Sequence, residues 1–250
     1  MFINNVIQFE KINATDCVNK MKRPNCREKT GISVAGLICL HYLCRLQTIR
    51  MSNKKDKKQA VIASQDADIT QCLKVLSAGG LILYPTDTVW GIGCDATNAE
   101  AVKRVYELKR RDDHKALIVL LDDAENLDHY VVDVPDIARE LVHVAVKPLT
   151  VIYEGAYNLA ANVLGDGDSV GIRIPNDEFC HRLCSRFGKP IVSTSANVSG
   201  EPTPKNFAAI SSDIVQGVDY AVSYRRDDNT PHEPSNIILL NRDGTFKIIR

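Results

Sequence analysis

A dense run of small polar side chains occupies residues 193–200, Ser-Thr-Ser-Ala-Asn-Val-Ser-Gly. It directly follows residues 189–192, which are typical of a buried strand. In α/β folds, ligands bind where strands leave the sheet, because backbone N–H groups and short polar side chains converge there. A turn rich in serine and asparagine, with no ligand, has the same composition. The run alone leaves both interpretations open.

Two further segments carry groups that suit an anion or a polar substrate. Residues 84–95 place Thr86 and Thr88 around an aspartate, directly after a short apolar run; a turn that satisfies its own backbone is the alternative. Lys109 and Arg111 stand at the end of a predicted helix, where cations also complement the helix dipole. Lysine offers a point charge and arginine a planar fork for phosphate or carboxylate. We expect these loops to share one cleft.

Three more polar residues lie within or next to predicted strands. Arg173 is flanked by apolar residues, so it needs a partner or solvent, and an ion pair is the alternative to ligand binding. Thr150 and Ser235 stand where loops enter strands. The sequence contains no Gly-x-Ser-x-Gly motif and no cysteine in an activating context. The inventory therefore suits positioning and charge stabilisation better than covalent catalysis.

The elements that must position these residues alternate between helix and strand. Apolar stripes predict helices over residues 67–78, from Asn98 onward, and over 136–146, 177–187 and 207–215. Short apolar runs predict strands over residues 81–84, 117–121, 149–153, 170–174, 191–193 and 220–222, and a terminal hairpin of 237–240 with 246–249. Alternation with an antiparallel ending predicts one α/β domain with a mixed sheet.

The charges divide the chain into two parts. Residues 1–58 contain 12 Lys/Arg and 4 Asp/Glu, whereas residues 59–250 contain 19 and 27. We predict that 1–58 form a basic leader or upstream extension without fixed structure, that Met51 is the working start, and that 59–250 form a single catalytic domain. The acidic body argues against strong nucleic-acid binding. The apolar run 31–44 is too short to span a bilayer.

The eight cysteines are scattered along the chain without paired Cys-x-x-Cys knuckles. This usage favours a reducing compartment over a disulfide framework, and it gives no sign of a structural zinc site. Cys180 and Cys184 are four residues apart on a predicted helix. One helix face explains that spacing as well as metal binding does, so we assign no metal ligands.

Together the motifs resemble the YrdC/Sua5 family of L-threonylcarbamoyl-adenylate synthases in its short form. The resemblance covers about residues 65–250 and rests on six segments in the family's order: Tyr-Pro-Thr-Asp-Thr at 84–88 with Gly91 and Gly93, Lys109-x-Arg111, 147–150, 170–175, 193–200, and Pro234-Ser235. It implies a twisted, mixed parallel and antiparallel sheet flanked by helices around an open, positively lined cavity. Asp112 and Ala116 depart from the family, which often has proline at both positions.

The resemblance implies that L-threonine, bicarbonate and ATP become L-threonylcarbamoyl-adenylate and pyrophosphate, for threonylcarbamoyl modification of adenosine in tRNA. Mg²⁺ would accompany the triphosphate, and the product would pass to a tRNA threonylcarbamoyl-transferase complex. We expect a cytoplasmic enzyme that is not bound to a membrane. The predicted catalytic residues are Lys109 and Arg111, and the predicted threonine-binding residues are Thr86, Thr88 and Arg111. The predicted ATP-binding residues are Lys109, Thr150, Arg173, Ser193, Ser195, Asn197 and Ser235.

Two other functions compete with this one. Carbamoyl transfer occurs in the related domain of hydrogenase-maturation carbamoyltransferases, which carry further domains and zinc-binding cysteines that this sequence lacks. A double-stranded RNA-binding module is the other, and the acidic body argues against it, although weak RNA binding by a local basic face stays open. Pyrophosphate release that depends on threonine would distinguish the synthase from both.

Overall fold

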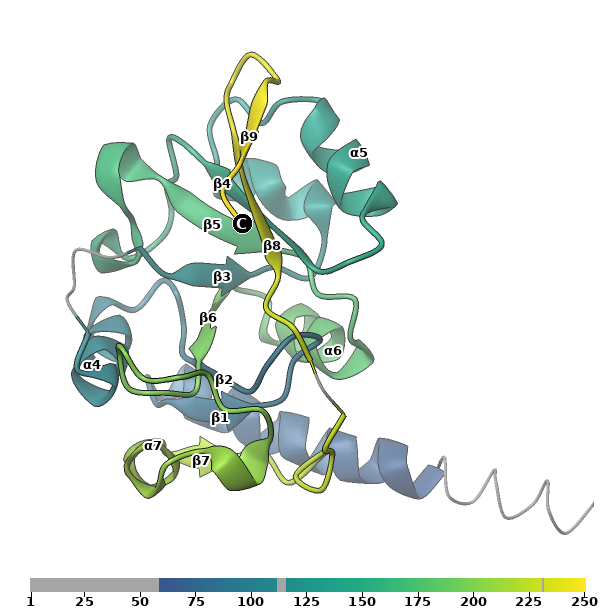
Figure 1. Ribbon diagram of the computed structural model, residues 1–250, viewed down its shortest axis with the longest axis vertical. Helices are drawn as coiled ribbons and strands as arrows, with labels where there is room; N and C mark the ends of the chain where they lie inside the picture. The colour runs from purple at the N-terminus through teal and green to yellow at the C-terminus, as the bar shows by residue number, and fades with distance from the viewer. Residues whose placement is uncertain (1–58, 112–115, 231) are drawn as a thin grey trace, which may run out of the picture. The chain divides into compact units, whose positions relative to one another are not determined.

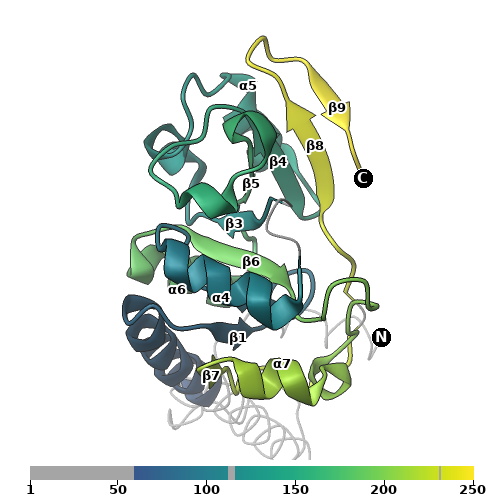
Figure 2. The ribbon, with the colours of Figure 1, turned by 90° about the vertical axis from the view of Figure 1, so that its left-hand side faces the viewer.

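Nine strands form one sheet in the order β7-β1-β2-β6-β3-β5-β4-β8-β9 (Figures 1 and 2). The pairs β1–β7, β3–β5 and β4–β8 are parallel, and the other neighbours are antiparallel. The predicted mixed sheet is therefore confirmed. The strands are β1 (Ile82–Tyr84), β2 (Gly91–Gly93), β3 (Ile118–Leu120), β4 (Leu149–Tyr153), β5 (Val170–Arg173), β6 (Ile191–Ser195), β7 (Tyr220–Ala221), β8 (Asn236–Leu240) and β9 (Phe246–Ile248).

This computed structural model describes residues 59–111, 116–230 and 232–250. The chain divides into two units, Met1–Ala63 and Ser64–Arg250, and the second holds all the strands and the helices α4 to α7. Residues 59–77 are helical. The predicted leader over 1–58 and the departure at Asp112 lie outside the described residues.

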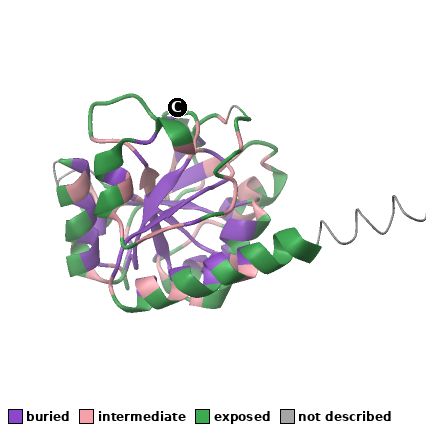
Figure 3. Ribbon diagram, turned by 90° about the horizontal axis from the view of Figure 1, so that it is seen from below, coloured by how far each residue is buried: buried purple, intermediate pink, exposed green. Residues whose placement is uncertain are grey.

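Four helices that Figure 1 labels connect the strands, and two of them begin at a side-chain cap. They are α4 (Ala99–Lys109), α5 (Ile137–Val144), α6 (Glu178–Phe187) and α7 (Ser212–Gly217). The side chain of Asn98 accepts hydrogen bonds from the N–H groups of Glu100 and Ala101, and Asp177 caps α6 in the same way through Cys180. Figure 3 shows buried strands and helices whose outward faces are exposed, as expected for amphipathic helices on a sheet.

Strand β2 was not predicted, because its two glycines suggested a loop. A Cβ atom on Gly93 would lie 2.7 Å from the Tyr84 ring and 2.8 Å from the backbone oxygen of Val192. These distances are too short for any side chain, so only glycine fits where β2 is held between β1 and β6. The glycine that suggested a loop is the residue that lets the strand fit.

The helix predicted over residues 207–215 is wrong as a single element. A 3₁₀ turn over Phe207–Ala209 is followed by extended backbone at Ile210 and Ser211, and α7 begins at Ser212. The apolar periodicity was correct, since Ile210 and Ile214 are both buried. The two turns reach the core separately.

The core contains the apolar faces of the strands together with four cysteines that carry no disulfide. Burial raises the pKa of the Cys180 and Cys184 thiols above their ordinary range. Their spacing thus reflects one buried helix face. Within the described residues, no helix combines the length and the hydrophobicity needed to cross a membrane.

Candidate active site

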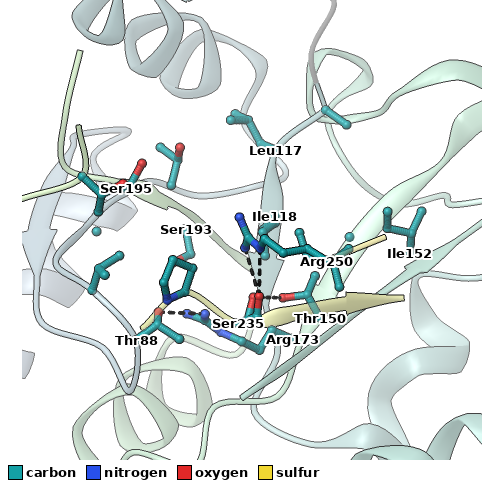
Figure 4. A pocket seen from close by; sticks show the side chains of 18 of the residues that line it. Thr88, Leu117, Ile118, Thr150, Ile152, Arg173, Ser193, Ser195, Ser235 and Arg250 are labelled. Atoms are coloured by element: carbon teal, nitrogen blue, oxygen red, sulfur yellow. Dashed lines mark hydrogen bonds between the residues drawn. The ribbon is translucent and has the colours of Figure 1, made fainter. Parts of the chain in front are cut away.

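A cavity of about 370 Å³ lies against the sheet, lined by residues of β2, β3, β4, β5, β6 and β8 and by the loops beside them (Figure 4). Seven of the ten predicted site residues line it: Thr88, Arg111, Thr150, Arg173, Ser193, Ser195 and Ser235. The expected convergence of separate loops on one cleft is therefore observed. The other three, Thr86, Lys109 and Asn197, support residues of the lining.

The alternation of side chains along strands explains why these positions meet. Gly171 and Arg173 of β5 face the cavity, while Val170 and Ile172, which alternate with them, are buried in the core. Thr150 of β4 is paired in register with Arg173, so both point to the same side. A Cβ atom on Gly171 would lie 3.3 Å from the Thr150 methyl carbon, and glycine thereby keeps the floor of the cavity open.

Arg173 joins β5 to the loop that follows β1. Its Nη1 donates a 2.9 Å hydrogen bond to Oγ1 of Thr88, and its Nη2 lies 3.5 Å from Oδ1 of Asp87. The side chains of Arg173 and Asp87 are 5% and 9% exposed. A buried guanidinium requires such partners. The sequence suggested an ion pair or a ligand-binding role for Arg173, and the structure shows an ion pair in a residue that also lines the cavity.

Thr86 stabilises the loop from within. Its hydroxyl donates to the backbone oxygen of Val89 at 2.8 Å and accepts from the N–H of Thr88 at 3.0 Å. The Thr86 and Thr88 hydroxyls are 2.9 Å apart. Because Thr86 has used its single proton, Thr88 must be the donor between them. Thr86 therefore satisfies the backbone of its own turn, as the alternative interpretation predicts. Thr88 is the threonine that lines the cavity.

Lys109 and Arg111 diverge because Arg110, between them, takes a left-handed conformation with φ +48° and ends α4. Lys109 is 2% exposed, and its Nζ donates to the backbone oxygens of Ser195 and of Asn197. Burial lowers its pKa to about 8, with the nearby charge of Arg111 acting in the same direction. Arg111 lines the cavity and donates a 3.0 Å hydrogen bond to the backbone oxygen of Ala116.

Asn197 stabilises the loop after β6. Its Nδ2 donates to the backbone oxygens of Val198 and Glu201, at 3.0 and 2.7 Å. The Ser199 N–H also donates to the backbone oxygen of Lys109 at 2.8 Å. The polar run 193–200 therefore has two parts: its first serines face the cavity, and its later residues hold the loop against the end of α4.

The last residue of the sequence, Arg250, also lines the cavity and was not predicted. Its Nε and Nη2 donate to the backbone oxygen of Ser235 at 3.2 and 3.0 Å (Figure 4). The Ser235 hydroxyl in turn lies 2.8 Å from that of Thr150, and both are buried. Three arginines thus line one cavity, and the lining residues in the described part of the chain include no aspartate or glutamate.

Three polar residues of the lining were assigned no role from the sequence: Ser169, Thr203 and Thr194, the last of which belongs to the polar run 193–200. Ser169 and Thr194 flank predicted segments, and only the pleat of the strands could have indicated them. Thr203 lies in the loop that follows residue 200, where the sequence carries no motif.

Comparisons with known proteins agree with this geometry. Residues 74–250 match the model of the Sua5_yciO_yrdC family, described as "Telomere recombination". A threonylcarbamoyl-AMP synthase of Pseudoalteromonas translucida is 35% identical over 177 residues, which are 70% of this chain and 94% of that protein. Another, of Saccharophagus degradans, is 37% identical over 139 residues, covering 55% of this chain and 73% of that one.

Solved structures share the fold. The crystal structure of P. abyssi Sua5 complexed with L-threonine has a TM-score of 0.65 and 26% identity, over 73% of this chain and 53% of that chain. This chain therefore spans about half the length of P. abyssi Sua5. E. coli YciO has a TM-score of 0.64 and 24% identity over 74% of this chain and 89% of its own, and shows the fold alone. The sheet, the cavity and the match over residues 74–250 together show that the chain belongs to the Sua5/YciO/YrdC family.

Proposed function

We propose that this protein synthesises L-threonylcarbamoyl-adenylate from L-threonine, bicarbonate and ATP and releases pyrophosphate. The observation that carries the proposal is the cavity itself, with three arginines and a series of hydroxyls and no carboxylate among its described lining residues. The reaction brings two anions together, a carbamate and a triphosphate. A cationic, partly enclosed cavity offsets their repulsion and stabilises the charge that develops between them.

The chemistry follows from the reactants. The amine of threonine and bicarbonate give a carbamate with loss of water. A carbamate oxygen then attacks the α-phosphorus of ATP, the bond from that phosphorus to the bridging oxygen breaks, and pyrophosphate leaves with the electron pair. Carbamates decompose in water, so the enclosure of the cavity protects the intermediate. The protein supplies positioning and electrostatic stabilisation, and none of its side chains needs to become covalently attached.

The roles of individual residues are part of the proposal. Arg111 and Thr88 bind threonine, with Thr86 fixing Thr88. Lys109 supplies a buried positive charge at the reacting end and holds the loop of Ser195 and Asn197. Geometry adds Arg250 as a further cation for the nucleotide. The proposed ATP-binding residues are Lys109, Thr150, Arg173, Ser193, Ser195, Asn197 and Ser235.

Mg²⁺ fits this site as part of the nucleotide. The described residues contain no cluster of three or more His, Cys, Asp or Glu side chains that could hold a metal ion, and the described cavity lining has hydroxyls but no carboxylates. Mg²⁺ prefers oxygen ligands, keeps several waters and commonly binds substrate phosphates. We therefore assign it to the triphosphate oxygens, where it neutralises charge.

The test is to incubate the protein with ATP, bicarbonate and L-threonine and to measure pyrophosphate. We expect release that requires all three substrates and falls when serine replaces threonine. Release without threonine, or no release at all, contradicts the proposal. Transfer of the product to a tRNA threonylcarbamoyl-transferase complex, a cytoplasmic location, weak RNA binding and a single catalytic domain over 59–250 remain predictions.

A further inference from the structure

Arg225 holds a cluster of polar groups next to the cavity, in the segment between β7 and β8. Its Nη1 donates a 3.1 Å hydrogen bond to the backbone oxygen of Thr86, and its Nε donates a 2.9 Å bond to Oδ2 of Asp228. Its Nη2 lies 2.7 Å from Nε2 of His232, and Nη1 is 3.7 Å from Oδ1 of Asp177. One side chain, 17% exposed, thus connects four groups from three parts of the chain.

The backbone of Arg225 is unusual as well. Its φ is +64°, a left-handed conformation that residues other than glycine rarely adopt. Such a conformation persists only where the surroundings impose it. The contacts of the guanidinium provide that restraint, and they hold the segment before Ser235 against the loop after β1.

We propose that Arg225 is a positioning residue that sets the conformation of the loop over residues 86–89 and, through it, the threonine-binding side of the cavity. Arg225 fixes the backbone of Thr86, the Thr86 hydroxyl accepts from Thr88, and Thr88 accepts from Arg173. Arg225 does not line the main cavity. It acts on the substrate only through Thr86 and Thr88.

The inference rests on the proposed function for its choice of substrate. Arg225→Ala should raise the KM for L-threonine about tenfold, because small displacements of positioning groups are costly, and the KM for ATP by less than about threefold. Arg225→Lys keeps a cation, but its single nitrogen cannot replace contacts that Arg225 makes through three separate nitrogens, so it should give an intermediate KM for threonine. If the alanine variant does not fold, the lysine variant provides the same test.

Arg226→Ala is the matched control. Arg226 is the next residue in the same segment and donates to the backbone oxygens of Val222 and Ala221, and its guanidinium stacks 4.7 Å from the ring centre of Phe207. It has no described contact with residues 86–89. General loosening of the segment would raise the KM of both variants equally, whereas the proposed role requires the rise in Arg225→Ala alone.

Chemical rescue adds a second measurement. Guanidinium at millimolar concentration should lower the threonine KM of Arg225→Ala toward the wild-type value, because the space left beside Thr86, Asp228 and His232 fits that ion, and it should leave Arg226→Ala unchanged. An unchanged threonine KM in Arg225→Ala, or an equal rise in Arg226→Ala, overturns the inference.

Amide hydrogen exchange separates the inference from the proposed function. The Thr88 N–H donates to the Thr86 hydroxyl, so its exchange should accelerate in Arg225→Ala and not in Arg226→Ala, whatever the enzyme makes. An inactive wild-type protein that shows this difference contradicts the proposed function but leaves the positioning role standing. Unchanged exchange in an active protein contradicts the positioning role alone.

Discussion

Lys109 donates a 2.7 Å hydrogen bond from its buried ammonium group to the backbone oxygen of Asn197. The lysine of the Lys109-x-Arg111 segment and an asparagine of the polar run 193–200 are therefore joined directly, although they are 88 positions apart in sequence. The lysine holds the loop whose first serines face the cavity, and Arg111 enters the cavity itself. The two motifs form one structural unit around the site.

Replacing Lys109 should change how stability depends on pH. Its pKa is about 8 in the folded protein against an ordinary 10.5, so between these values the unfolded chain binds a proton that the folded chain lacks. The contribution of Lys109 to the free energy of unfolding therefore increases with pH over that range. Its neutral amine still has two N–H groups, one for each backbone oxygen that it contacts, of Ser195 and of Asn197. Relative to Lys109→Met, the free energy of unfolding of the wild type should grow by up to about 3 kcal/mol between the two pH values.

Denaturant unfolding of both proteins across this pH range provides the measurement. Other titrating groups change alike in the two proteins and cancel in the difference. A difference that stays flat or falls contradicts the lowered pKa of Lys109.

Removing the guanidinium of Arg111 should impair catalysis without unfolding the protein. We expect Arg111→Ala to lower kcat/KM. The drop should correspond to a loss of about 2–4 kcal/mol of transition-state stabilisation, which is typical for the removal of one electrostatic donor. Arg110→Asn is the control, because Arg110 is exposed in an ion pair with Asp213 and asparagine tolerates its left-handed backbone. Steady-state pyrophosphate release should separate the two variants, and equal activity of both would remove Arg111 from the site.

The hydrogen bond between Thr150 and Ser235 should appear as an energetic coupling. Each hydroxyl is buried, so Thr150→Val or Ser235→Ala leaves the other without its partner and should cost about 1–2 kcal/mol of stability. The double variant should lose less than the sum of the two, with a coupling of about 1 kcal/mol. Chemical denaturation of the wild type, the two single variants and the double variant completes this double-mutant cycle. If the stability losses of the single variants simply add up in the double variant, the two side chains do not interact.

Gly93 should tolerate no side chain. Gly93→Ala places its Cβ against the Tyr84 ring and the Val192 backbone and should destabilise the fold by about 1–3 kcal/mol. At Gly91 in the same strand the nearest atoms would be 3.4 Å away, so Gly91→Ala should cost less. Thermal unfolding compares them, and a smaller loss at Gly93 than at Gly91 contradicts the close approach of β1, β2 and β6.

Sequence patterns predicted much of this molecule because short apolar runs form buried strands. Ser193, Arg173 and Thr150 meet because the register of the mixed sheet places their side chains on the face that lines the cavity, although β5 and β6 run in opposite directions. The direction of Lys109 was not predictable, since it depends on a left-handed turn at an arginine rather than at a glycine. Arg250 was missed because the predicted terminal hairpin ended at residue 249, whereas hydrogen bonds between Arg250 and Ile237 extend the pairing with β8 by one residue.

The origin of the product's atoms tests the central claim most directly. The protein should be incubated with ATP, L-threonine and ¹³C-labelled bicarbonate, and the nucleotide product analysed by mass spectrometry. We predict a nucleotide that contains AMP, threonine and one labelled carbon, formed together with pyrophosphate. A threonine–AMP product without the labelled carbon, or the absence of any threonine-dependent nucleotide, would contradict the assignment.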